Sequence, residues 1–292
     1  MANVQMTIFT PTYNRAYRLP KLYESLCDQT CKSFEWLVVD DGSTDNTEDL
    51  VKKWINENKI TIRYYKQENG GKQRAHNVGV DKSNGLLFVC VDSDDYIVSE
   101  FVEKHLMQLE LLMKERKFAG IISLQGYTNE KPVGTFFPEG ITHTTLTELY
   151  GKRKYKGDST LVYYTEILKK HPFIVEKGEK FIGEGYVYYQ IDQEYELLVL
   201  PEILTIKEYL KDGYTKNVRK LTKDNPKGYV RLKRQTIEYA TTWKERYMQT
   251  ILYMVGCRMA KEKQIKNAPY KMLAMIAYFP AWVVWKIFYE RA

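Results

Sequence analysis

The sequence predicts an α/β protein with a parallel, doubly wound sheet, followed by a helical C-terminal extension. Three observations support this prediction. Short apolar segments typical of buried strands alternate with segments of helical periodicity. A cluster of polar residues follows each of the first four apolar segments. The last part of the chain is basic and aromatic, with helical stretches.

The first half of the chain supplies the strands and the helices between them. Ser43 or Thr44 is expected to cap a helix that runs through Trp54. The expected strands are Met6–Thr10, Glu35–Val39, Ile60–Tyr65, Leu86–Val91 and Gly120–Leu124. Between them we expect helices after Arg15, at Ala75–Val80 and at Ser99–Met113.

Polar residues gather where the first four strands end. The four clusters are Thr10–Arg15, Asp40–Asp45, Asn69–Arg74 and Asp92–Asp95. In an open parallel sheet the carboxyl ends of the strands share one edge, and ligands bind there. The clusters are therefore expected to meet. Neither a Gly-x-Gly-x-x-Gly segment after the first strand nor a P-loop sequence is present, which argues against a dehydrogenase or a P-loop enzyme.

The fourth cluster places three carboxylates, Asp92, Asp94 and Asp95, at the mouth of an apolar strand. Acids packed there repel one another and are costly to desolvate without a cation. A hard divalent metal bound to a phosphate is one candidate partner, because Mg²⁺ and Mn²⁺ take oxygen ligands. The alternative is an acidic turn that caps the helix expected at Ser99–Met113.

Composition limits the class of protein and its compartment. The 292 residues suffice for one large α/β domain with an appendage, or for two domains. The net charge of +7 indicates an anionic partner such as a phosphate ligand, a nucleic acid or an acidic membrane. The four cysteines show no metal-ligand spacing and predict free thiols in the cytoplasm. No secretory signal is expected before the first strand.

We divide the chain into three parts. Residues 1–125 and 126–213 are expected to be two parts of one domain, and 214–292 form a basic, helical region. The segment Tyr270–Tyr289 is apolar and aromatic, but it is short for a membrane span and contains Pro280. Its tryptophans and lysines suit a peripheral contact with an anionic membrane, on the inner face of the cell membrane. Packing against the main domain or a second subunit is the alternative.

Four motifs together resemble those of family 2 glycosyltransferases. They are Thr10-Pro-Thr-Tyr-Asn-Arg15, Val38-Val-Asp-Asp-Gly-Ser-Thr-Asp45, Asn69-Gly-Gly-Lys72 and Asp92-Ser-Asp-Asp95. The resemblance covers about residues 4–213 and extends to bacterial enzymes that build surface polysaccharides. It implies a GT-A fold, with a Rossmann-like, doubly wound mixed sheet, and an inverting transfer from a nucleotide-diphosphate sugar with Mn²⁺ or Mg²⁺. In such a fold residues 1–125 would bind the nucleotide sugar and 126–213 the acceptor.

The resemblance also implies which residues bind the donor. Tyr13 would stack on the base, as aromatic faces do, or would simply pack in its turn. Asp41 would accept the uracil N3–H, or would cap the helix after Gly42, while Asp40 orders the turn. The expected donor-binding set is completed by Thr10 and Pro11 at the base, Arg15, Lys72 and Arg74 near the diphosphate, and Asp92 and Ser93 near the ribose or sugar. For Lys72 and Arg74 the alternative is a solvated helix start.

The resemblance also implies that acidic residues bind the metal and act in catalysis. Asp94 would be the principal metal ligand, and Asp95 would assist at the metal or cap the next helix. The family's base is a carboxylate pair, and the matching position here reads Glu184-Gly185, so the second acid is missing. Glu184 is our candidate general base, ahead of Asp158 and Asp192. The alternative is that Glu184 is a surface acid in a mobile glycine loop. Gly183 and Gly185 would let this loop close over substrate, or they only mark a turn.

With the resemblance, these residues predict a metal-dependent glycosyltransferase. It would move a sugar from a UDP-sugar to a glycan or lipid-linked acceptor in the synthesis of cell-surface polysaccharide. Because the second acid is missing, a non-catalytic sugar-nucleotide-binding or assembly subunit is the alternative. Nucleic acid is not an expected partner, since no recognition helix or RNA-binding signature accompanies the basic stretch Lys216–Arg234. The sequence names neither the sugar nor the acceptor.

Overall fold

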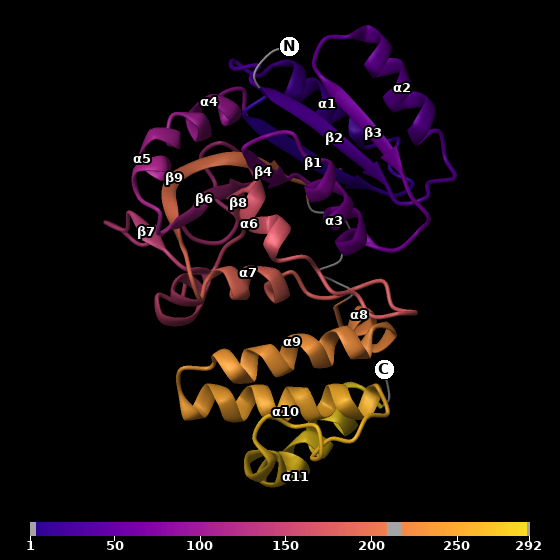
Figure 1. Ribbon diagram of the computed structural model, residues 1–292, viewed down its shortest axis with the longest axis vertical. Coiled ribbons are helices and arrows are strands. Elements are labelled where there is room, and N and C mark those ends of the chain that lie inside the picture. Colours follow the sequence, from indigo (N-terminus) through magenta and orange to yellow (C-terminus); the bar gives the residue numbers. More distant parts are fainter. Residues whose placement is uncertain (1–3, 209–217, 291–292) are drawn as a thin grey trace. The chain divides into compact units, whose positions relative to one another are not determined.

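The computed structural model describes residues 4–208 and 218–290 (Figure 1). The chain forms two compact units. Unit 1 holds the described residues of 1–172 and 187–209, and unit 2 those of 173–186 and 210–292. The segment 173–186 thus belongs with the C-terminal helices. The predicted boundary between 213 and 214 lies outside the described residues, and the three predicted parts of the chain stay predictions.

Unit 1 is built on one sheet, in which nine strands are described. Their order is β3-β2-β1-β4-β8-β6-β9-β5, and β7 pairs with β9. The strands are β1 (Met6–Thr12), β2 (Phe34–Asp40), β3 (Ile62–Lys66), β4 (Leu87–Cys90), β5 (Asp95–Ile97), β6 (Phe118–Gly126), β7 (His143–Thr144), β8 (Ser159–Tyr164) and β9 (Glu196–Lys207).

The sheet is mixed. Strands β3, β2, β1 and β4 are parallel, whereas β8 runs antiparallel to both β4 and β6. The wholly parallel sheet predicted from alternation alone is therefore wrong beyond β4, and the mixed sheet implied by the resemblance is confirmed. Parallel neighbours need a crossover, usually a helix. Between β6 and β8 the chain supplies only the two-residue β7 and the π-helix η1 (Thr147–Lys152).

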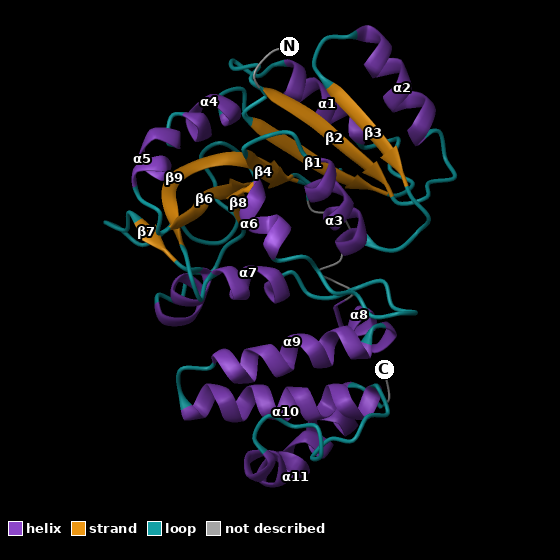
Figure 2. Cartoon of the chain, in the orientation of Figure 1, coloured by secondary structure: helices purple, strands orange, loops and turns teal. Residues whose placement is uncertain are grey.

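Helices cover both faces of the sheet (Figure 2). One face carries α1 (Leu19–Cys27), α2 (Thr47–Glu57), α4 (Phe101–Leu106) and α5 (Leu109–Lys114), whose buried residues share one apolar cluster. The other carries α3 (Lys72–Lys82) and, beside it, α6 (Thr165–Lys170). The single helix expected at Ser99–Met113 is thus two helices. Unit 1 also takes most of α7 (Gly185–Ile191).

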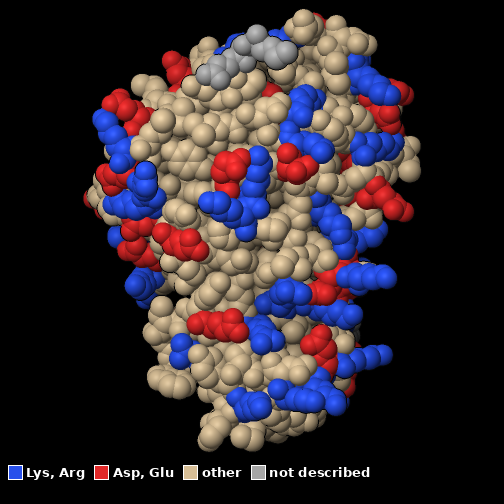
Figure 3. Space-filling view, in the orientation of Figure 1, with Lys and Arg blue, Asp and Glu red and all other residues tan. Residues whose placement is uncertain are grey.

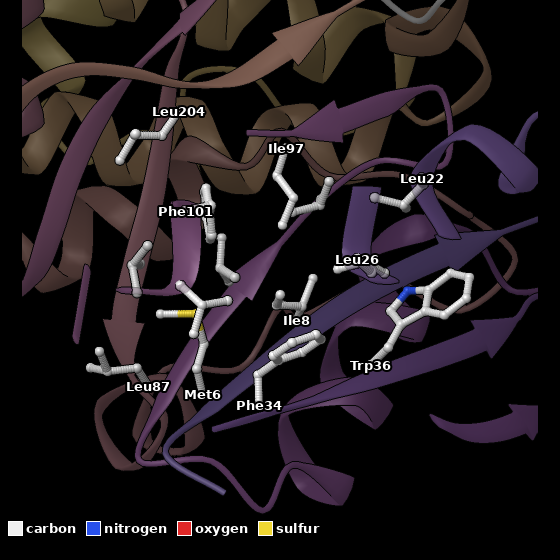
Figure 4. Packing of buried hydrophobic residues seen from close by; sticks show 14 of the residues in the cluster. Met6, Ile8, Leu22, Leu26, Phe34, Trp36, Leu87, Ile97, Phe101 and Leu204 are labelled. Carbon is white, nitrogen blue, oxygen red and sulfur yellow. The ribbon is translucent and has the colours of Figure 1, made fainter. Parts of the chain in front are cut away.

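Successive side chains of β1 pack on opposite faces of the sheet. Met6 and Ile8 join the cluster under α1, where Leu22, Leu26 and Trp36 also lie (Figure 4). Phe9 points to the opposite face, where its ring stacks on Phe88 with centroids 5.3 Å apart. This period-2 alternation is what a strand covered on both sides requires. Strand β1 is therefore packed on both faces along the stretch that leads to the first polar cluster.

Unit 2 contains the helices of the predicted C-terminal extension. They are α8 (Val218–Asp224), α9 (Pro226–Tyr239), α10 (Trp243–Met259) and α11 (Lys271–Phe288). The Glu179 carboxylate accepts hydrogen bonds from the backbone N–H groups of Lys227 and Gly228 at 2.8 and 2.7 Å, and so caps α9. Helix α10 packs against both α9 and α11. The helical extension is therefore confirmed, and α11 continues through Pro280 without a break.

Candidate functional site

The four polar clusters follow strands β1, β2, β3 and β4, which run in the same direction. Their carboxyl ends consequently share one edge of the sheet, as the sequence predicts. The hydrogen bonds described next link every cluster to another one, so the structure brings all four together.

Asn14 ties the first cluster to the second. Its backbone N–H donates to Ser43 Oγ at 2.8 Å, and its Oδ1 accepts from the Thr44 N–H at 2.8 Å. Asp45 accepts from the Thr47 N–H at 3.1 Å at the start of α2. The predicted capping by Ser43 or Thr44 is therefore wrong, because these residues are engaged with Asn14.

Asp40 orders the second cluster, as expected. Its Oδ1 accepts from the Ser43 N–H at 2.7 Å, and its Oδ2 accepts from the Tyr64 hydroxyl at 2.6 Å. The carboxylate is fully buried, so both oxygens need such partners. This leaves Asp40 as a structural residue of the turn.

Asp41 joins the second cluster to the third. Its Oδ1 accepts from Gln67 Nε2 at 2.6 Å and from the Gly70 N–H at 2.8 Å. Its Oδ2 accepts from the Gly71 N–H at 2.8 Å and from Asn69 Nδ2 at 3.2 Å. The carboxylate does not cap α2. It holds the loop 67–71. Since these four bonds fill the lone-pair sites of the carboxylate, a bond to a nucleobase would have to displace one of them.

Two glycines allow the second and third clusters to approach each other. Gly71 has φ 94° and ψ 159°, a conformation that residues with a Cβ rarely adopt. Gly42 has φ 84°, and a Cβ there would lie 3.1 Å from the backbone nitrogen of Asn69. Both positions therefore require glycine for a local geometric reason.

Lys72 links the third cluster to the fourth. Its Nζ lies 2.7 Å from Asp92 Oδ1 and 3.0 Å from Oδ2. Burial acts to raise the pKa of Asp92, but the Lys72 charge and hydrogen bond outweigh it and the pKa is lowered. Arg74 donates from Nη1 to the Gly70 carbonyl at 2.8 Å. Lys72 and Arg74 are thus engaged within the site and are not a solvated helix start.

Asp94 and Asp95 make the fourth cluster strongly acidic. Burial, and next the negative charge of Asp92, raise the pKa of both groups, that of Asp95 to about 8. Asp95 starts β5, which pairs with β9, and α4 begins only at Phe101. The alternatives in which Asp95 or this turn caps a helix are therefore wrong.

The donor atoms here suit a hard divalent cation, because all of them are carboxylate oxygens. Across residues 4–208 and 218–290, no group of three or more His, Cys, Asp or Glu side chains is arranged to hold a metal ion by itself. A cation would take its remaining ligands from phosphate oxygens or water, as Mg²⁺ commonly does. The residues present fit that mode of binding.

The remaining predicted donor-binding residues differ in exposure. Tyr13 is 48% exposed, so its ring is not packed away in the turn. Thr10 is fully buried and its Oγ1 accepts from Trp36 Nε1 at 3.0 Å, which leaves only its backbone for a ligand. Arg15 donates to the Tyr17 hydroxyl at 2.7 Å, and its charge opposes, without overcoming, the rise in the pKa of Asp94 that burial and Asp92 cause. Pro11 is partly exposed and Ser93 is buried.

Sequence reasoning missed Lys207. Its Cα pairs with that of Asp95 in the β5–β9 ladder, and its Nζ lies 3.0 Å from Asp158 Oδ2. It therefore adds a cation beside the acidic cluster. No local motif marks it, because its place depends on pairing between distant strands. Two buried polar atoms without a hydrogen-bond partner, Thr12 Oγ1 and Gln73 Oε1, also lie in or beside these clusters.

The three candidate bases have different surroundings. Asp192 accepts from the Leu146 and Thr147 N–H groups at 3.1 and 2.7 Å, so it caps η1, and Asp158 is paired with Lys207. Glu184 is exposed at the turn before α7 and lies in unit 2. The Tyr186 N–H donates to the Gly183 carbonyl at 2.9 Å, so the glycine segment forms a turn.

The chain is similar in sequence to known glycosyltransferases. Glycosyltransferase GlyA of Streptococcus pneumoniae is 38% identical over 99 residues, which are 34% of this chain and 14% of GlyA. Poly(ribitol-phosphate) beta-N-acetylglucosaminyltransferase TarS of Staphylococcus aureus is 29% identical over 175 residues, 57% of this chain and 28% of TarS. The matched segments thus span less than a third of either relative.

Solved structures show the same fold. TarS 1–349 of S. aureus in complex with UDP-GlcNAc has a TM-score of 0.59 at 18% identity, over 97% of this chain and 91% of that one. Mannosyltransferase PcManGT of Pyrobaculum calidifontis, in complex with GDP-Man and Mn²⁺, has a TM-score of 0.57 at 14% identity, over 96% and 80%. These neighbours confirm the GT-A fold.

The family model named Glycosyl transferase family 2 matches residues 7–170. This range includes all four polar clusters. Since the match covers more than half of the 292 residues, the chain belongs to glycosyl transferase family 2.

Proposed function

We propose that the chain is a metal-dependent, inverting glycosyltransferase that moves a sugar from a UDP-sugar to a glycan or lipid-linked acceptor in the synthesis of cell-surface polysaccharide. One observation carries the proposal. Hydrogen bonds join the four polar clusters along one sheet edge and place Lys72 against the acidic fourth cluster. The complex of TarS with UDP-GlcNAc supports a UDP-sugar as the donor class.

In this proposal the first three clusters hold the nucleotide. Tyr13 offers an exposed aromatic face on which the uracil stacks. Asp41 accepts the uracil N3–H in place of the Asn69 side-chain amide, whose bond of 3.2 Å is the longest of the four. Arg15, Lys72 and Arg74 supply positive charge for the diphosphate. The backbones of Thr10 and Pro11 shape the base pocket.

The fourth cluster holds the rest of the donor. Asp92 and Ser93 contact the ribose or the sugar, and Asp94 and Asp95 hold the divalent cation. PcManGT was solved with Mn²⁺, which supports a divalent metal in this fold. When bound, the cation stabilises the negative charge that develops on the departing diphosphate.

The transfer needs a base for the acceptor hydroxyl, and we propose Glu184 for that role. Its carboxylate takes the hydroxyl proton while the acceptor oxygen forms a bond to the anomeric carbon. The bond from that carbon to the diphosphate oxygen breaks, and its electron pair leaves with UDP. Attack from the opposite side inverts the anomeric configuration. Lys72 and Arg74 then balance charge on the leaving diphosphate.

We also propose where the enzyme works. TarS is named for a polymeric acceptor, poly(ribitol-phosphate), which supports a polymer or a lipid-linked glycan here. The four free cysteines suit the reducing cytoplasm. A peripheral contact with anionic lipid on the inner face of the membrane would bring the enzyme to a lipid-linked acceptor.

Donor hydrolysis and binding test the proposal. The purified protein is incubated with a panel of UDP-sugars and Mn²⁺, Mg²⁺ or a chelator, and UDP release is measured. We expect release with one of these donors, dependent on the metal, and a loss of about a hundredfold in Asp94→Asn. Asp81→Asn, at an exposed acid, is the matched control. If a folded protein neither binds nor hydrolyses any sugar nucleotide, the proposal is wrong.

The missing acid at Gly185 favours a second candidate, a non-catalytic subunit that binds sugar nucleotides. It predicts UDP binding without turnover and no change in Glu184→Gln. The enzyme proposal instead predicts unchanged UDP affinity with transfer reduced at least a hundredfold in that variant.

A further inference from the structure

The exposed side of α11 is apolar, whereas a surface helix of a water-soluble domain usually has polar residues on its exposed side. Its outer face consists of residues that recur every three or four positions and are 37% to 72% exposed, namely Met272, Met275, Ile276, Phe279 and Trp282. By length and composition, α11 is the one helix of the described chain that could cross a membrane. A continuous row of exposed large apolar side chains indicates a binding surface.

The opposite side of α11 is small and buried. Ala274, Ala277 and Ala281 pack in the apolar cluster shared with α10, and Trp285 is partly buried beside them. The guanidinium of Arg258, on α10, lies 5.0 Å from the Trp285 ring centroid. Because α10 carries charged residues and holds α11 along one side, a spanning position would require α11 to leave this packing. Only the outer face is available to a partner.

The net charge of unit 2 indicates what kind of partner the outer face of α11 binds. Residues 218–290 contain 15 Lys and Arg against 5 Asp and Glu, a net charge of +10, whereas the whole chain carries +7. Blue side chains accordingly outnumber red ones on the visible surface of unit 2 (Figure 3, lower part). Lys261, Lys263 and Lys266 are exposed in the loop that leads into α11, and Lys271 and Lys286 lie near its ends.

We propose that the outer face of α11 lies flat in the interface of an anionic membrane, with Phe279 and Trp282 inserted among the acyl chains. The basic α10–α11 loop would contact the headgroups, and Lys271 and Lys286 would extend toward them. A second copy is a poorer occupant, because it would bring two strongly positive units together. The residues named here and the flat orientation of α11 specify the peripheral membrane contact. The need for such a contact rests on the proposed function.

Vesicle binding tests the inference on the full chain without any donor. Co-sedimentation is measured with phosphatidylcholine vesicles and with vesicles in which phosphatidylglycerol replaces about a third of the lipid. We expect binding to the anionic vesicles and release by about 1 M NaCl, since salt screens headgroup attraction. Phe279→Ser with Trp282→Ser should weaken binding at least tenfold. Lys261, Lys263 and Lys266 changed together to Gln should weaken it roughly a hundredfold.

The matched control changes two exposed methionines of unit 1, Met107→Ser with Met113→Ser, and should leave vesicle binding unchanged. Circular dichroism checks the folding of each variant. Absence of binding, equal binding to neutral vesicles, or bound protein that resists salt and alkaline extraction would overturn the inference. So would a dimer in vesicle-free buffer that Phe279→Ser with Trp282→Ser dissociates. UDP release without vesicles reports separately on the proposed function.

Discussion

Replacing Asp41 by Asn tests the junction between the second and third clusters. The wild-type carboxylate accepts four hydrogen bonds, two on each oxygen, and is 5% exposed. In Asp41→Asn one oxygen becomes an NH₂ group, which cannot accept. The side-chain amides of Gln67 and Asn69 can turn their own oxygens toward it, but the backbone N–H of Gly70 or Gly71 cannot.

At least one partly buried backbone donor is therefore left without a partner in either orientation of the new amide. Such a loss costs about 1–3 kcal/mol, and the remaining bonds lose the assistance of charge. We expect the free energy of unfolding to fall by about 2 kcal/mol. A loosened loop 67–71 should also lower the affinity for UDP about tenfold or more, because Lys72 follows it directly.

Urea unfolding and calorimetric titration with UDP measure the two effects. Asp81→Asn serves as the control, since Asp81 is 71% exposed and its only described ion pair is with Lys82. That variant should stay within about 0.5 kcal/mol of wild type. If Asp41→Asn matched the control in both stability and UDP affinity, the role given to this carboxylate would be refuted.

Three further predictions use other residues. Burial lowers the pKa of His105 from 6.5 to about 4. Between these pH values the unfolded chain binds a proton at His105 and the folded chain does not. The free energy of unfolding should therefore fall by up to about 3 kcal/mol as the pH drops from 6.5 to 4. Urea unfolding against pH measures this, with exposed His143→Gln as a variant that keeps the slope. Gly71→Ala should cost about 1–3 kcal/mol, because Ala rarely adopts its conformation, whereas Gly151→Ala, in open space, should cost under 0.5; equal effects would contradict the strain argument. Lys72→Gln should weaken UDP binding about tenfold by calorimetry, and unchanged affinity would remove Lys72 from the diphosphate.

The part of the site built from short segments could be predicted from the sequence. Each parallel strand carries its own hydrophobic pattern and ends at a local polar cluster, so one rule about strand ends brings the clusters together. The same pattern also predicts the burial of the Thr10 side chain. Thr10 has the same parity as Met6 and Ile8, and this alternation already placed its side chain in the core beneath α1.

Features that depend on pairing between distant strands could not be predicted. Lys207 reaches Asp95 only because β9 returns beside β5, and β8 enters between β4 and β6 against the expected direction. The sequence suggests a nucleobase or a helix as the partner of Asp41, whereas Gln67, Gly70 and Gly71 donate to its carboxylate in the structure. A carboxylate in a turn can find several donors, and the sequence does not rank them.

The proposed function requires a pyrophosphate held through a cation where the four clusters meet. A crystal structure with UDP and Mn²⁺, recorded at a wavelength that gives an anomalous manganese signal, tests this most directly. We predict an anomalous peak in contact with Asp94, the uracil against the Tyr13 ring and the diphosphate beside Lys72. Clear UDP density elsewhere, or a manganese peak away from the fourth cluster, would contradict the account.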